Sequence, residues 1–211
     1  MKVVICVVYI VLSLTSACSN PVENKTKAII SDSNSADVKM QNEGEPVNFS
    51  GETSTLEFGA SKITGQQEGG FKTFSGLIDL VNNQPEGSQV SVNIDMASVF
   101  TDADGLTSHL KTADFFDVGN YPHATFVSTN ISPDKDNKAA TFLVTGELEF
   151  HGVKKSITFP ATIVVSPDSV RVEAEFFFNR REFNVNYQGR ANDLIRDEVI
   201  LRFRVLARRK M

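Results

Sequence analysis

The chain has 211 residues, a formal net charge of −5 at pH 7, 16 phenylalanines and no tryptophan. This length suits one domain with appendages, because domains commonly run to about 100–200 residues. The mild acidity argues against a protein that binds a nucleic-acid backbone through a basic stripe, so no nucleic-acid partner is expected. The many phenylalanines predict an interior rich in rings that carry no polar atom.

Residues 1–17 have the pattern of a signal peptide. Lys2 precedes an apolar run over residues 3–14, which is too short for a membrane span of about 20 residues, and small residues follow it. The last residues, which lead into Cys18, resemble a bacterial lipobox, in which the cysteine becomes the lipidated first residue of the mature chain. We therefore expect an exported, periplasmic lipoprotein that is anchored to a membrane through Cys18. An ordinary secretory signal with an incidental cysteine is the alternative.

Residues 18–53 are predicted to be a flexible polar tether, and residues 54–211 to be the folded domain. The tether has few apolar residues and no sustained periodicity, so it cannot bury enough surface to offset its chain entropy. Without lipidation of Cys18, the same segment is interpreted as an ordinary disordered terminus. The two cysteines, Cys6 and Cys18, both lie in or beside the signal, so the folded domain must rely on its core rather than on a disulfide.

From about residue 54 onwards, apolar and polar residues alternate with a period of two, which is typical of half-exposed antiparallel strands. The clearest segments are residues 88–100, 140–150, 156–165, 169–178 and 198–207. About eight such strands with mostly short links predict an all-β sandwich or closed barrel. A barrel of this size is either filled by side chains or holds one small ligand, and the alternation does not distinguish the two.

One short helix is predicted over residues 102–111, between two strands. Asp102 is the expected N-cap, and Leu106, His109 and Leu110 would share a face. The residues that follow are expected to close the mouth of the barrel. In that connection Asp114 is expected to cap a short turn by accepting backbone N–H groups.

Four motifs in order carry a resemblance to a known family. They are HLKTADFFDVGNYPHATF, GELEFHGVKKSITFPATI, NRREFNVNY and DLIRDEVILRFRVLA, which begin at His109, Gly146, Asn179 and Asp193. Together they resemble the YceI-like family of exported bacterial lipid-binding proteins, also called polyisoprenoid-binding proteins. The resemblance covers roughly residues 54–208.

The resemblance implies an all-β, antiparallel, lipocalin-like β-barrel of about eight strands with one short helix between strands. It also implies an apolar tunnel that holds an isoprenoid or fatty-acyl chain, and a homodimer, since dimers occur in the family. Apart from the bound lipid, it implies no cofactor. The expected function is therefore non-enzymatic binding, storage or transport of such a lipid. A lipid-responsive interaction protein and a lipid-modifying enzyme are the alternatives.

The sequence departs from the family pattern at two places. Leu106 and Thr107 stand where many members have an Arg-Asp pair, so no role of that pair is carried over. Glu182-Phe183-Asn184 replaces the usual Asp-Phe-Gly. Asparagine can adopt the left-handed backbone that glycine allows, although less readily.

The candidate lipid-binding residues are the inward-facing apolar side chains of the strands, together with three from the mouth-closing segment. Each buried methylene contributes about 0.8 kcal/mol, so about ten buried carbons would offset the entropy of immobilising a chain. The alternative is that these side chains pack only on one another. The set comprises Phe74, Ile78, Val92, Ile94, Leu110, Phe115, Phe116, Phe126, Phe142, Val144, Leu148, Phe159, Phe176 and Phe178.

The polar candidates favour structural roles. His109 and Asp114 would form an acid–base pair in an enzyme, but no nucleophile or third partner accompanies them. The three histidines lack the short spacing of metal ligands, so no metal is expected. His151 is interpreted as a tight-turn residue with Gly152. Arg180 and Arg181 are expected to pair with an acidic residue at the barrel end, with a lipid head group as the alternative partner.

Overall fold

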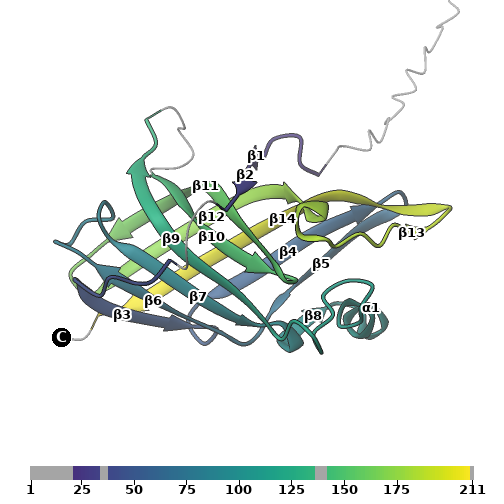
Figure 1. The fold of residues 1–211 in the computed structure, drawn as a ribbon, viewed down its shortest axis with the longest axis horizontal. Helices are drawn as coiled ribbons and strands as arrows, with labels where there is room; N and C mark the ends of the chain where they lie inside the picture. The colour runs from purple at the N-terminus through teal and green to yellow at the C-terminus, as the bar shows by residue number, and fades with distance from the viewer. Residues whose placement is uncertain (1–20, 34–37, 136–141, 210–211) are drawn as a thin grey trace, which may run out of the picture.

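The computed structural model describes residues 21–33, 38–135 and 142–209, which form an antiparallel sheet curled into a half-barrel (Figure 1). The expected signal at residues 1–17 and the lipidation site Cys18 lie outside these ranges. Along the main path of the sheet the strand order is β3-β6-β7-β9-β10-β11-β12-β14-β4-β5-β8. Within the described residues, no helix is long and apolar enough to span a bilayer.

The sheet contains fourteen strands in the described residues, more than the eight or so that were expected. The all-β antiparallel architecture with one short helix, α1 (Asp104–Leu110), is confirmed. Two 3-10 helices, η1 (Met96–Ser98) and η2 (Arg180–Phe183), accompany it. The strands are β1 (Thr26–Lys27), β2 (Ile29–Asp32), β3 (Glu45–Ser50), β4 (Thr55–Lys62), β5 (Gly65–Phe71), β6 (Phe74–Leu80), β7 (Gln89–Asp95), β8 (Val99–Thr101), β9 (His123–Pro133), β10 (Phe142–Phe150), β11 (Val153–Val165), β12 (Ser169–Asn179), β13 (Gly189–Arg190) and β14 (Asp193–Arg208).

Three strands lie within residues 18–53, so the expectation of a flexible tether is wrong for this part of the chain. β3 pairs with β6 and buries Val47 and Phe49. β1 pairs in parallel with β12, and β2 pairs antiparallel with β11. The alternation in β3 covers only six residues, and the stability of β1 and β2 comes from the neighbouring strands rather than from their own composition. A local polarity argument therefore missed all three.

Helix α1 begins without the expected side-chain cap. Its N-cap residue is Ala103, which makes no side-chain hydrogen bond, so the prediction for Asp102 is wrong. Two threonines organise this end instead: the Oγ1 atoms of Thr101 and Thr107 lie 2.8 Å apart, and Thr107 Oγ1 accepts the Thr101 N–H at 2.9 Å. Thr107, which stands with Leu106 in place of the Arg-Asp pair of the resembled family, therefore has a structural role.

Two left-handed backbone positions were correctly predicted. His151 and Gly152 have φ values of 51° and 71° and form the two-residue turn between Phe150 and Val153. Both central residues have positive φ, as in the tight hairpin turns that match the twist of the flanking strands. Asn184 has φ 58° and ψ 16° and ends η2, so asparagine adopts the left-handed backbone here.

The end of the half-barrel near the C-terminus is fastened by side chains between β3 and the residue that follows β14. Arg209 Nε and Nη2 donate to the carboxylate of Glu45 at 3.1 and 2.5 Å, and Nη1 donates to the Ser166 carbonyl oxygen at 3.1 Å. The hydrogen bond from Arg209 lowers the pKa of Glu45 below its ordinary value of 4.5. This ion pair therefore connects the start of β3 to the C-terminal end of β14.

We expect this ion pair to make stability depend on pH. Because the pKa of Glu45 is lower in the folded state, the pair stabilises the fold above the ordinary pKa, and this contribution is lost as pH falls through the folded-state value. The melting temperature of Glu45→Gln should therefore fall below that of the native protein at neutral pH and approach it in acid. Melting curves between about pH 7 and about pH 3 test this.

The matched control is Glu86→Gln, which removes an exposed carboxylate from the loop between β6 and β7. It should leave the pH dependence unchanged. A difference between Glu45→Gln and the native protein that persists in acid would show that charge is not the cause.

Candidate functional site

A cavity of about 150 Å³ lies against the inner face of the curled sheet. Its lining is apolar except for Thr55, Ser88 and Gln89. Thr55 begins β4, and Gln89 begins β7 just after Ser88. These starts lie at the end of the sheet where the C-terminus also lies (Figure 1). The cavity is therefore apolar along its length and meets polar side chains at one end.

Nine of the fourteen predicted lipid-binding residues line this cavity. They are distributed over β6, β7, β9, β10, β11 and β12, so the inward face was correctly assigned on all six strands. Whether they bind a lipid stays a prediction. The nine are Phe74, Ile78, Val92, Ile94, Phe126, Val144, Leu148, Phe159 and Phe176.

Three others belong to a separate cluster beneath α1. Leu110, Phe115 and Phe116 pack with core residues such as Phe58 and Phe71, and they do not border the cavity. Figure 1 shows α1 at the opposite end of the sheet from the C-terminus. The mouth-closing segment therefore fills one end of the barrel, and its side chains do not form a lid over the cavity.

Phe142 and Phe178 also do not line the cavity. Phe142 is the first residue of β10 and is only partly buried against the core. Phe178 is buried and meets the ring of Phe183 from η2 at 5.7 Å between ring centres. Both residues are at inward-facing positions of the alternation. Each lies near the end of its strand, where it packs against core residues instead of bordering the cavity.

Several lining residues were not among the candidates. Those on β11 and β12 followed the same alternation as their selected neighbours, and those on β14 lie in the alternating segment 198–207, so the signal was present. Phe49 lies on β3 and was hidden by its assignment to the tether. The main additions are Phe49, Leu56, Leu80, Val90, Ile131, Ile157, Ile163, Val165, Val170, Val172, Leu201, Phe203 and Val205.

A group of aromatic rings forms part of the cavity wall. Phe159 and Phe176 are stacked, with centroids 4.6 Å apart and an interplanar angle of 14°. Phe203 meets Phe159 edge-on at 5.5 Å, and Phe126 lies 5.7 Å from Phe159. Offset-stacked and edge-to-face arrangements are the favoured geometries for such rings. The wall is therefore well packed here, and any enlargement of the cavity requires these rings to move.

Room for one of these rings depends on a glycine. A Cβ atom at Gly146 would lie 2.5 Å from a ring atom of Phe126 and equally close to the Val127 carbonyl oxygen. Any larger residue at position 146 would therefore have to displace backbone as well as the ring. Gly146 lies on the inner face of β10 between Val144 and Leu148, as the alternation predicted.

Two of the three polar side chains at the end of the cavity, those of Ser88 and Gln89, already have partners. Ser88 Oγ accepts the Val81 N–H at 2.9 Å and donates to the Gln84 carbonyl oxygen at 2.5 Å. Gln89 Oε1 accepts the Gln41 N–H at 2.8 Å. Because these groups are satisfied within the protein, the lining suits an apolar ligand rather than one that needs several hydrogen bonds.

His109 and Asp114 are brought together but lie outside the cavity. His109 Nε2 and Asp114 Oδ2 are 2.7 Å apart, so Asp114 bonds the histidine and the prediction that it caps a turn is wrong. The imidazole also contacts the rings of Phe115 and Tyr187, each at 5.0 Å between centroids. Within the described residues, no hydroxyl or thiol side chain hydrogen-bonds to this imidazole. The pair joins helix α1 to the segment that follows it.

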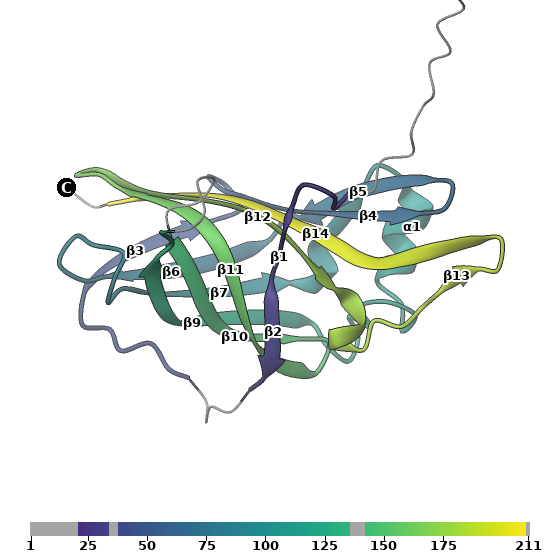
Figure 2. The same cartoon turned by 90° about the horizontal axis from the view of Figure 1, so that it is seen from above.

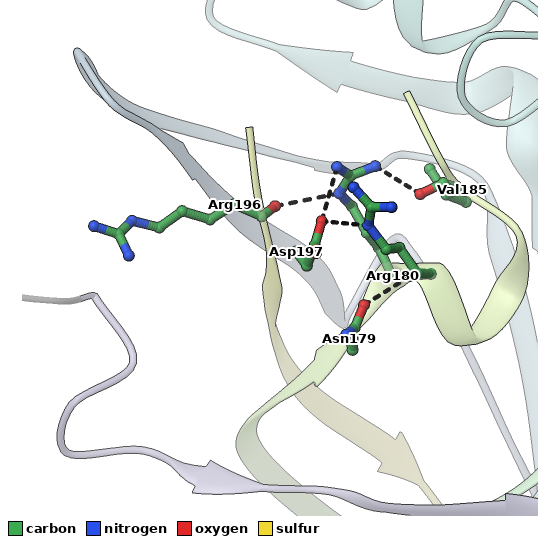
Figure 3. Close-up of polar contacts among 6 residues, drawn as sticks. Asn179, Arg180, Val185, Arg196 and Asp197 are labelled. Atoms are coloured by element: carbon green, nitrogen blue, oxygen red, sulfur yellow. Dashed lines mark hydrogen bonds and ion pairs between the residues drawn. The ribbon is translucent and has the colours of Figure 1, made fainter. Parts of the chain in front are cut away.

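Arg180 holds η2 against the start of β14, as predicted (Figure 3). Its side chain is 5% exposed and donates to Val185 O at 2.6 Å, Arg196 O at 3.2 Å and Asp197 Oδ1 at 3.1 Å. Burial lowers the pKa of Arg180, and the negative charge of Asp197 opposes that shift. Arg181 Nε also reaches Asp197, at 2.7 Å. With three protein partners, the Arg180 guanidinium is committed to the fold.

Known proteins share this fold and much of the sequence. A family model described as YceI-like domain matches residues 48–207. Protein YceI of Escherichia coli is 32% identical over 158 residues, which is 71% of this chain and 76% of the relative. A UPF0312 protein of Pseudomonas putida is 42% identical over 94 residues, 44% of this chain, and the match spans 47% of the relative, about half its length.

Two solved structures extend the comparison. BcnA of Burkholderia cenocepacia superposes with a TM-score of 0.65 at 27% identity, covering 73% of this chain and 96% of that one. A polyisoprenoid-binding domain from Saccharophagus degradans gives a TM-score of 0.61 at 18% identity, covering 79% and 100%, so the likeness is to its fold alone. The family model covers well over half of the sequence, and the chain therefore belongs to the YceI-like family.

Proposed function

We propose that this protein binds a hydrophobic chain lipid, of isoprenoid or fatty-acyl type, in the cavity and stores or carries it without chemical change. The observation that carries this proposal is the apolar cavity of about 150 Å³ on the inner face of the half-barrel. The family membership and the likeness in fold to a polyisoprenoid-binding domain support it. No cofactor other than the lipid is part of the proposal.

The volume of the cavity sets how much of a chain it can hold. A cavity of roughly 150 Å³ lined by apolar side chains takes a group about the size of benzene. Six carbons at about 0.8 kcal/mol each give roughly 5 kcal/mol, which corresponds to a dissociation constant of roughly 0.1–1 mM. Micromolar binding needs at least about ten buried carbons, because the entropy of immobilising the chain must also be offset. A lipid bound that tightly would therefore extend beyond a cavity of this volume.

We also propose that the protein is an exported periplasmic lipoprotein anchored through Cys18. Pro21 and Val22 line a small depression together with Gly59 and Ile200, which are register partners on β4 and β14. Three residues of extended chain reach about 10 Å at most, so an anchor at Cys18 would hold the domain close to the membrane surface. A homodimer, as family resemblance implies, is a further part of this proposal, and light scattering of the purified protein tests it.

The lipid itself is the test of the proposed function. A Cys18→Ser variant, which cannot be lipidated, is purified without detergent. In native mass spectrometry it should show a species heavier than the chain by the mass of a chain lipid. Denaturing the same sample should release that mass and leave the bare polypeptide. A sample that carries only the bare mass, and takes up nothing after incubation with vesicles made from a bacterial lipid extract, would contradict the proposal.

A further inference from the structure

We propose that the seam between β11 and β12 is a lateral portal through which the lipid chain reaches the cavity. Residues 26–32, called the strap below, are its gate. The inference rests on the proposed function of the cavity and assigns a role to a segment that precedes the region matched by the family model, which begins at residue 48.

β11 and β12 are hydrogen-bonded to each other over only part of their length. They pair from Thr162 to Val165 on β11. Farther from the C-terminal end of the sheet, residues 155–158 of β11 pair with β2, and Phe176 and Phe177 of β12 pair with β1. Figure 2 shows the strap as a purple ribbon between the two strands. The strap therefore occupies a gap in the barrel wall.

The strap packs against residues that form the wall of the cavity. Ala28 is 3% exposed and packs in the same core cluster as Phe159 and Phe176. The stacked rings of these two phenylalanines line the cavity. The Ala28 N–H donates to the Phe177 carbonyl oxygen at 2.8 Å, which holds the alanine in the gap. Withdrawal of the strap would uncover the cavity wall from the side.

The strap is held by few interactions. Its ladder comprises two residues of β1 and four of β2, and Ile29 is 70% exposed. Two ion pairs flank it, Lys25 with Glu175 at 2.5 Å and Lys155 with Asp32 at 3.6 Å. Exposed pairs of this kind contribute little to stability. In the core, Ala28 and Ile30 of the strap pack only in the cluster around Phe159 and Phe176. No strap residue packs in the cluster beneath α1 or in the one around Val47 and Phe74, so the strap can open without global unfolding.

A lateral portal also accounts for how a long chain reaches a short cavity. Through the seam a chain can enter sideways, next to Phe159 and Phe176, instead of threading past the end at Ser88 and Gln89. Opening the strap frees one side of the stacked rings of Phe159 and Phe176. A chain of about ten carbons, which is longer than the cavity, could then extend along that side. Lipid uptake is therefore expected to depend on strap opening.

The test is a disulfide that locks the strap. Ser31 and Ser156 are register partners on β2 and β11. Partners in an antiparallel ladder lie about 4.5–5.5 Å apart at Cα, within the range that a disulfide spans. Ser31→Cys/Ser156→Cys is made in the full chain with Cys6→Ser and Cys18→Ser, so the new pair are the sole cysteines. Oxidation should slow uptake of a fluorescent fatty acid from phosphatidylcholine vesicles at least about 10-fold, and dithiothreitol should restore the rate.

The matched control places the same bond elsewhere. Ser75→Cys/Asn93→Cys joins register partners on β6 and β7, away from the seam, and its oxidation should leave the uptake rate unchanged. A second variant opens the gate: Ala28→Asp introduces a charge at a buried position of the strap and should accelerate uptake. Slower uptake by the oxidised strap lock together with faster uptake by Ala28→Asp would support the gate.

The outcomes separate the gate from the proposed function. If the oxidised strap lock takes up the fatty acid at the native rate, the gate is wrong and the chain enters by the end of the cavity. If neither the native protein nor any reduced variant binds the fatty acid, the proposed function is wrong and the gate is wrong with it.

Discussion

Val172→Phe is expected to weaken binding of a fluorescent fatty acid by roughly 100-fold while the protein stays folded. Val172 lines the cavity and is only partly buried, so a larger side chain can extend into free space. A phenyl ring occupies most of a cavity of about 150 Å³. Excluding about four ligand carbons removes about 3 kcal/mol of binding free energy. Fluorescence titration measures the loss, and circular dichroism checks the fold.

The control for this change lies on the adjacent strand with the opposite orientation. Val164 is 48% exposed on β11 and is next to Ile163, the register partner of Val172. Val164→Phe adds the same side chain outside the barrel and should leave the affinity unchanged. If Val172→Phe folds and retains native affinity, the ligand does not occupy this cavity.

Arg180→Ala is expected to lower the free energy of unfolding by about 3 kcal/mol, because it leaves two backbone carbonyl oxygens without their donors. The change removes the donors to the carbonyl oxygens of Val185 and Arg196 and empties a buried site at η2. Asp197 keeps its hydrogen bond from Arg181, which limits the loss. Urea unfolding should show a lower midpoint at an unchanged slope.

Arg181→Ala provides the comparison, since both arginines contact the same carboxylate. The Arg181 side chain is 39% exposed, and exposed pairs contribute at most about 1 kcal/mol. A midpoint for Arg180→Ala equal to that of Arg181→Ala would mean that the carbonyl contacts contribute nothing, and the structural role given to Arg180 would be rejected.

Local chemistry accounts for what could be predicted from particular residues. The turn at His151 and Gly152 follows from backbone conformations that depend on only two residues. The inward faces of β7 and β10 follow from alternation, because side chains of a strand point to opposite sides in turn. The pairing of His109 with Asp114 is also local, since five residues separate them, but Asp114 was predicted to cap a turn instead.

Long-range packing explains the errors. Phe49 was placed in a tether because the strand around it is short, yet its pairing with β6 buries it. The strap forms strands because β11 and β12 leave backbone groups unpaired at the seam, which the composition of residues 26–32 does not reveal. Asp102 was assigned as a helix cap, but the contact between Thr101 and Thr107 fixes the start of α1.

The amino-acid sequence alone determined the antiparallel all-β class, the membership of the YceI-like family and the face on which each long strand buries its apolar side chains. The tertiary structure decided which inward side chains border empty space. Val144 lines the cavity, whereas Phe116, which is equally apolar, fills the end beneath α1. Alternation reports only the direction of a side chain; free volume depends on the curl of the whole sheet and on which distant segments pack into its ends and its seam.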